Sequence, residues 1–245
     1  MLRRGTALRT GILLLLAGPV LSWLAELITA AAWQHPHYAP LHNYVSHLGV
    51  KGPETAFDQI AHSPLAWVMN TGWVVYGLIL IGSAFLVFDS RAAGRRPVVL
   101  QVLAVLAGIG VMLVGIFHVS QANVDNGLIA FHLIGAQPAF VCGNLFALLT
   151  GAWGRSLGLP PAVRRAQIAL GVTGLTGFVL FMIDVRGAIA WNIGLFERMA
   201  VYPVMTGHLL LAVTLLLRTA ARRPRAPEGD DTSAELVGRA AAKAL

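Results

Sequence analysis

Residues 98–118 read VVLQVLAVLAGIGVMLVGIFH and contain no lysine, arginine, aspartate or glutamate. A helix rises about 1.5 Å per residue, so a run of this length can cross the roughly 30 Å hydrocarbon core of a bilayer. Other long apolar runs without lysine or arginine recur along the chain. We therefore predict six membrane-spanning helices, at about residues 10–33, 65–88, 98–118, 128–152, 167–184 and 200–217.

The composition of the whole chain supports this fold class. Of its 245 residues, 56% are hydrophobic and 12% are charged, whereas about 25% of the residues in a soluble domain are charged. We predict an all-α, polytopic membrane protein, a bundle of six transmembrane helices that forms one domain over residues 1–218. Residues 219–245 are rich in arginine and proline and then acidic, which predicts a largely disordered cytoplasmic tail.

The basic residues are distributed unequally between the two sides of the predicted bundle. Only Lys51, Arg186 and Arg198 fall on the side away from the termini. Because basic loops stay in the cytoplasm, we predict cytoplasmic termini in the plasma membrane and an outward-facing loop at residues 35–49. The formal charge of +7 follows from this distribution, so we expect no nucleic-acid partner. The basic residues on the predicted cytoplasmic side are Arg3, Arg4, Arg9, Arg91, Arg95, Arg96, Arg155, Arg164, Arg165, Arg218, Arg222, Arg223, Arg225, Arg239 and Lys243.

The first apolar run has one alternative interpretation. Arg3-Arg4 precedes it, and Ala30-Ala31-Ala32 resembles the cleavage site of a secretory signal peptide. The run is long for such a signal and contains Glu26. We therefore predict that the first helix is retained.

Ionisable residues within the predicted spans are candidates for function, because a charge is costly in a membrane. Glu26, His132 and His208 lie inside spans, and His118 ends the third one. At about 1.5 Å per residue, Glu26 and His208 lie at similar depths, so they can pair if the first and last helices adjoin. Such a pair is either an interhelical hydrogen bond worth about 1 kcal/mol or part of a ligand or proton site.

All eight histidines fall on the predicted outer side or in the outer half of a span. Imidazole binds metals and carries protons near neutral pH. However, the chain has no His-Glu-x-x-His sequence and a single cysteine, Cys142, so we predict no metal, no cofactor and no internal disulfide. Ser46 lies next to His47 but outside any Gly-x-Ser-x-Gly turn. Gly171, Gly174 and Gly177 share a face, which predicts a close helix contact.

The segment from Pro40 to Gly49, PLHNYVSHLG, resembles the Pro-Leu-x-Asn-x-Ile/Val-Ser-Asp-Leu-Gly segment of a membrane family of unknown function, DUF998, and more distantly the DRAM-like six-helix membrane proteins. The resemblance to DUF998, a bacterial family, covers about residues 38–210 and implies a six-helix membrane protein without an assigned reaction. His47 stands where the family usually has aspartate, and His118 where proline is common. Looser matches are Ser63-Pro64, Met69-Asn70-Thr71-Gly72, Gly115-Ile116-Phe117 and Gly194-Leu195-Phe196-Glu197-Arg198.

These observations lead to one functional prediction and two alternatives. We predict a polar pocket, open to the outer face, that binds a lipid head group or a small polar ligand. Arg198 contacts an anionic group in this pocket, or it only forms an interfacial ion pair with Glu197. One alternative is a membrane-embedded hydrolase or transferase that acts on lipid through the outer histidines. Few polar residues lie at mid-membrane, which argues against a transporter. The candidate pocket residues are Glu26, Asn43, Ser46, His47, His118, His132, Glu197, Arg198 and His208.

Overall fold

The computed structural model describes residues 2–57, 59–88, 94–187 and 192–221. Within them it contains six helices that are long and apolar enough to cross a membrane, which confirms the all-α polytopic class. These helices are α1 (Leu2–Ala32), α2 (Ala66–Val87), α3 (Arg95–Ile116), α5 (Ile129–Ala152), α6 (Pro161–Gly187) and α7 (Ile193–Ala221). The shorter elements are a 3-10 helix (Ser46–Gly49), the antiparallel strands β1 (Glu54–Ala56) and β2 (Gln59–Ala61), and α4 (Gln121–Asp125).

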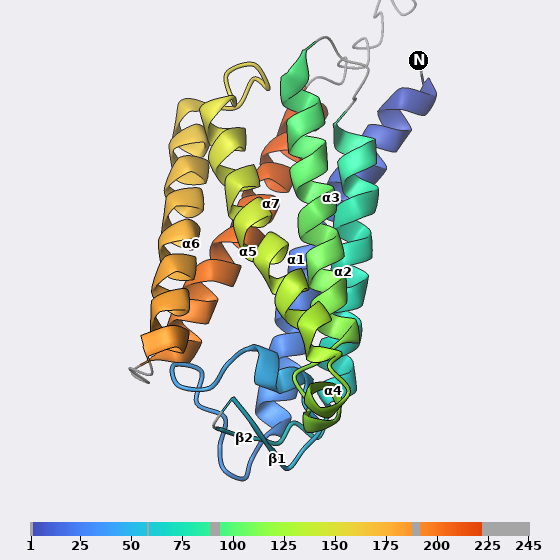
Figure 1. The fold of residues 1–245 in the computed structure, drawn as a ribbon. Coiled ribbons are helices and arrows are strands. Elements are labelled where there is room, and N and C mark those ends of the chain that lie inside the picture. The colour runs from blue at the N-terminus through green and yellow to red at the C-terminus, as the bar shows by residue number, and fades with distance from the viewer. Residues whose placement is uncertain (1, 58, 89–93, 188–191, 222–245) are drawn as a thin grey trace, which may run out of the picture.

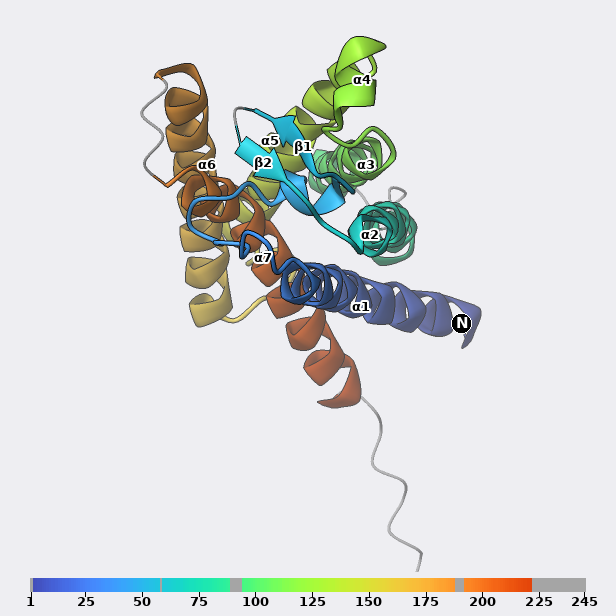
Figure 2. The same cartoon turned by 90° about the horizontal axis from the view of Figure 1, so that it is seen from below.

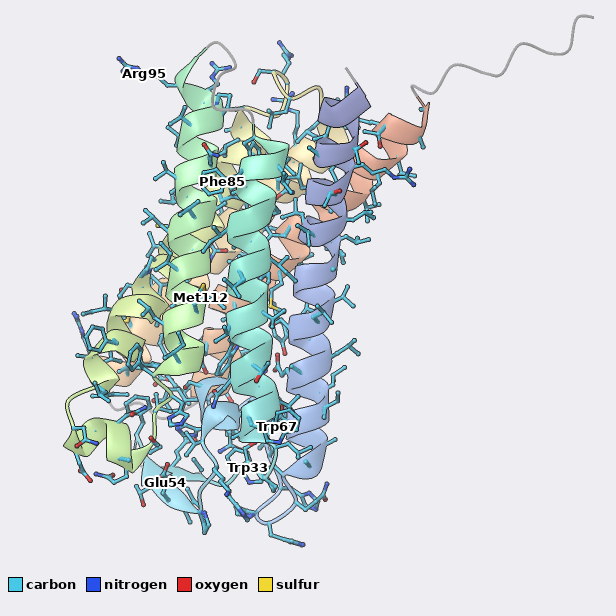
Figure 3. All side chains as sticks on the ribbon, turned by 90° about the vertical axis from the view of Figure 1, so that its right-hand side faces the viewer. Trp33, Glu54, Trp67, Phe85, Arg95 and Met112 are labelled. Atoms are coloured by element: carbon cyan, nitrogen blue, oxygen red, sulfur yellow. The ribbon has the colours of Figure 1, made fainter. Side chains whose placement is uncertain are left out.

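The six long helices form a ring (Figures 1 and 2). Each packs against the next in chain order, and α7 returns to contact α1 and also contacts α5. The 3-10 helix, the β-hairpin and α4 gather at one end, which we call the loop end, and Figure 2 shows the hairpin lying across the ring there. Figure 3 places Trp33 and Trp67 at the loop end and Arg95 at the opposite end. The side chain of Trp67 is 67% exposed, as expected of an aromatic residue at a membrane interface.

Glycine residues bring the helix backbones close together. A Cβ atom on Gly77 of α2 would overlap the backbone of Gly108 in α3, and one on Gly110 would overlap Gly135 of α5. On α6, Gly171 and Gly174 pack against α5, and Gly177 packs against Met199 of α7. The predicted close contact of this α6 face is therefore confirmed. Such contacts suit a membrane, where helix association depends on close packing rather than on hydrophobic burial.

Helix α5 changes partners along its length. Its C-terminal half packs on α6 as far as Phe140, whose ring lies 5.6 Å from that of Phe178. Its N-terminal half packs on α3 through Gly135, and Pro138 lies at the transition. Figure 1 shows α5 running obliquely from the side of α6 to the side of α3 at the loop end. The two helices α5 and α6 consequently separate toward the loop end.

Helix ends differ from the prediction where charged residues continue a helix beyond the bilayer core. Helix α6 begins at Pro161 rather than 167, because the arginine side chains of its first turns can reach the interface while their stems stay apolar. Helix α7 begins at Ile193 rather than 200, which places Glu197 and Arg198 inside it. Helix α2 begins at Ala66, after a turn, and ends at Val87, close to the predicted span of 65–88. The predicted tail at 219–245 lies outside the described residues beyond Ala221.

Candidate functional site

A buried ionic network joins the first and last helices near the loop end. Arg198 of α7 forms an ion pair with Glu26 of α1 at 3.0 Å, and the two side chains are only 8% and 9% exposed. Tyr202 donates a hydrogen bond to Glu26 at 2.8 Å and accepts one from Nε of Arg198 at 3.2 Å. Arg198 also donates to the hydroxyl of Tyr38. The network thus closes the ring between α1 and α7.

The remaining donors of Arg198 bind backbone carbonyl groups. Its guanidinium donates to the carbonyl oxygens of Pro40, Asn43 (3.3 Å) and Gly194 (3.2 Å). With Glu26, Tyr38 and Tyr202 these partners engage all three guanidinium nitrogens. Tyr38 in turn donates to the carbonyl of Tyr44 at 3.0 Å, and burial raises the pKa of Tyr38, so its phenol stays protonated. Arg198 therefore holds the loop at residues 38–44 against α7 rather than offering a free cation.

Glu197 holds the next part of the same loop. Its carboxylate accepts hydrogen bonds from the backbone N–H groups of Val45 and Ser46, the latter at 3.3 Å, where the 3-10 helix begins. The predicted ion pair between Glu197 and Arg198 is wrong, because the acidic partner of Arg198 within 4 Å in the described residues is Glu26. Neighbouring residues on a helix point in different directions, which separates the two side chains.

His208 has a different partner from the predicted one. Its Nδ1 lies 2.8 Å from the hydroxyl of Tyr76 on α2, and both side chains are buried. The predicted pairing of Glu26 with His208 is therefore wrong. Glu26 lies level with Arg198 and Tyr202, which both contact its carboxylate, whereas His208 lies six residues, about 9 Å, farther along α7 than Tyr202. The predicted depth of His208 was counted from residue 200, whereas α7 begins at Ile193.

His47 is fully buried beneath the β-hairpin. Its ring centroid lies 4.7 Å from that of Tyr44 and 6.2 Å from that of Phe57. Burial lowers the pKa of His47 to about 4, against a smaller opposite effect of the Ala56 backbone, so the imidazole is neutral at pH 7. Phe57 has a φ angle of 49°, which is unusual for a bulky residue, and this backbone turn carries its ring to His47.

Hydrogen bonds hold the other predicted residues in place. Asn43 accepts from the backbone of Ala39 at 2.8 Å and donates to Gln59 at 3.1 Å. His132 of α5 hydrogen-bonds the carbonyl of Phe117 at 2.9 Å, and His118 lies 3.0 Å from Asn123. Within the ranges that the structure describes, no three histidine, cysteine or acidic side chains gather closely enough to hold a metal ion.

A cavity of about 300 Å³ lies inside the ring toward the loop end. Its wall is mostly apolar, and all six long helices contribute to it. Three of the nine candidate residues line it, Ser46, His132 and Glu197, whereas the other six do not. Tyr44 and Trp73, which each carry one polar group, also line the cavity. The apolar residues of the wall are Val45, Phe57, Val111, Val114, Leu133, Ala136, Ala139, Phe140, Phe181, Met182, Val185, Val201, Val204 and Met205.

Most of this wall could not be identified from the sequence. Valine, phenylalanine and methionine on six separate helices look the same whether they face lipid, a neighbouring helix or a cavity. Gln137 is different: it is a polar residue in an apolar helix, it lines the cavity, and it is exposed. Its position within the fourth predicted span, like that of Ser22 within the first, was a signal that could have pointed to the cavity.

The exposed residues of the wall mark where the cavity opens. Leu133 and Gln137 on α5, Val185 on α6 and Phe57 on the hairpin are all exposed and all line the cavity; Leu133 and Val185 are each 48% exposed. Figure 1 shows α5 leaving α6 toward the loop end, and three of these residues, Leu133, Gln137 and Val185, belong to these two helices. The opening therefore lies on the side of the bundle, beneath the hairpin.

Fold and site together define a class, the polytopic integral membrane proteins built as a ring of six helices. A family model described as "Protein of unknown function (DUF998)" matches residues 16–214. The chain belongs to this family, as the motif at residues 40–49 predicted. No curated protein and no solved structure matches the chain.

Proposed function

We propose that this protein binds an amphiphile taken from the surrounding membrane, with the apolar chain of the ligand inside the cavity. The observation that carries the proposal is the side opening between α5 and α6, bordered by Leu133, Gln137 and Val185. An opening on the flank of a membrane-spanning bundle faces lipid chains rather than water. A lipid can enter there without leaving the bilayer.

The size and lining of the cavity fit one apolar chain. Its volume of about 300 Å³ is at the lower end for ligand sites, which are mostly apolar with a few placed polar groups. A methylene group is close in volume to a water molecule, about 30 Å³, so a chain of about ten carbon atoms fills the space. A two-chain phospholipid does not fit entirely.

This proposal modifies the prediction of a polar pocket that binds a head group through Arg198. Arg198 is engaged by Glu26 and the loop, so the apolar wall, rather than an ion pair, supplies the affinity. Ser46 and His132 border the cavity and can contact the polar end of the ligand. The excess of basic residues near the termini supports a cavity in the outer half of the membrane.

The test uses decan-1-ol as the probe and the protein in phosphatidylcholine nanodiscs. Binding is measured by equilibrium dialysis and corrected for partition into empty nanodiscs. We expect saturable binding that is lost in Ala136→Phe, which fills the cavity, and kept in Ile134→Phe. Ile134 lies on the same helix but is 61% exposed and does not line the cavity. Equal binding by all three proteins, or none by the unmodified protein, would refute the proposal.

A further inference from the structure

We infer that the cavity selects amphiphiles with an uncharged or cationic polar group and excludes anionic ones. This inference rests on the proposed function and adds the chemical class of the ligand. Its basis is the charge of the wall. Among the described residues that line the cavity, Glu197 alone belongs to the charged types, and no lysine or arginine is present.

The buried cluster around Glu197 contains more acid than base. Glu26 and Glu197 supply two carboxyl groups, and Arg198 supplies one guanidinium, which is paired with Glu26 at 3.0 Å. Glu197 has backbone N–H groups of Val45 and Ser46 as partners. Because a carboxylate offers about four acceptor positions, Glu197 can accept further hydrogen bonds from a ligand.

The other polar groups of the wall carry no positive charge that could balance an anion. They are the side chains of Ser22, Tyr44, Ser46, Trp73, Tyr76, His132 and Gln137. Tyr76 is engaged by His208, and His132 by the carbonyl of Phe117. A hydroxyl or ammonium group can donate to Glu197 and to the serine hydroxyls. A sulfate, phosphate or carboxylate would meet a carboxyl group without a compensating cation, in surroundings that screen charge poorly.

The experiment compares three probes that share one decyl chain: decan-1-ol, decylamine and decyl sulfate. Each is measured by the same dialysis in phosphatidylcholine nanodiscs, corrected for partition into empty ones. We expect decan-1-ol and decylamine to bind at least about tenfold more tightly than decyl sulfate, since unfavourable charge juxtaposition is costly at buried sites. Glu197→Gln should reduce the preference for decylamine over decyl sulfate.

The outcomes separate this inference from the proposed function. If decyl sulfate binds as tightly as decan-1-ol, and Ala136→Phe abolishes both, the inference is overturned while the proposed function stands. If no probe shows binding that depends on Ala136, the proposed function fails and the inference with it. The comparison of probes on the unmodified protein does not depend on whether Glu197→Gln folds.

Discussion

Replacing Arg198 by methionine should destabilise the protein strongly, because it leaves Glu26 without its cation. The side chain of Glu26 is 9% exposed, and after the substitution its carboxylate keeps only the hydroxyl of Tyr202 among the partners described above. Breaking a buried ion pair by removal of one partner costs about 3–5 kcal/mol. The loop carbonyls of Pro40 and Asn43 also lose their donor, so we expect the upper part of this range.

A double-mutant cycle isolates the contribution of the pair itself. Glu26→Gln removes the acid, and the combined Glu26→Gln/Arg198→Met variant removes both charges. Because the two residues share one network, the double variant should be more stable than the sum of the single losses predicts, by about 1–3 kcal/mol. The free energy of unfolding is measured by reversible denaturation in mixed detergent micelles, followed by tryptophan fluorescence.

Arg186→Met is the matched control, because Arg186 is an exposed arginine on α6. It should change the free energy of unfolding by no more than about 0.5 kcal/mol. The reasoning is refuted if Arg198→Met costs no more than this control. It is also refuted if the losses of Glu26→Gln and Arg198→Met add within about 0.5 kcal/mol, as independent sites do.

Three further predictions concern a titrating residue, a helix contact and the topology. The pKa of His47 in the folded protein, about 4, lies below its ordinary value of 6.5. The free energy of unfolding should therefore fall by up to about 3 kcal/mol as the pH is lowered from 6.5 to 4. His47→Asn should remove this part of the pH dependence in the same denaturation assay. Gly174→Ala should lower the free energy of unfolding by about 1–3 kcal/mol, because the added Cβ would overlap Asn144. Gly82→Ala is the control, because the atom nearest to its added Cβ is 3.9 Å away. A similar loss of stability in Gly82→Ala would contradict the packing argument. With Cys142 replaced by alanine, a cysteine at the exposed position of His37 should react with a membrane-impermeant maleimide on intact cells; reaction only after lysis would reverse the orientation.

The sequence predicted the membrane spans because long runs without basic residues are rare outside membranes. It predicted helix ends less well, since residues such as Arg164 and Glu197 are charged yet continue a helix into the interface. It found Glu26 but assigned the wrong partner. Counting residues gives the depth of a side chain only when the helix ends are known, and α7 begins at Ile193 rather than 200, so His208 lies deeper in the bundle than Glu26.

The cavity could not be predicted for a related reason. It exists because α5 leaves α6 for α3 near Pro138, and this change of partner depends on the shapes of several helices together. Single residues such as Val111 and Met205 give no sign of it. His47, by contrast, was singled out as a departure from the family motif, and it is fully buried between aromatic rings.

The ion pair between Glu26 and Arg198 also bears on the biogenesis of the protein. The partners lie 172 positions apart in the chain, in α1 and α7, the first and the last helix of the described residues. While the ribosome is still producing the middle of the chain, Glu26 already lies in a newly inserted helix without its cation. Glu26 gains its guanidinium partner only when α7 enters the bilayer. A chain that stops short of α7 keeps an unpaired acid in the membrane, and this distinguishes an incomplete product from a finished one.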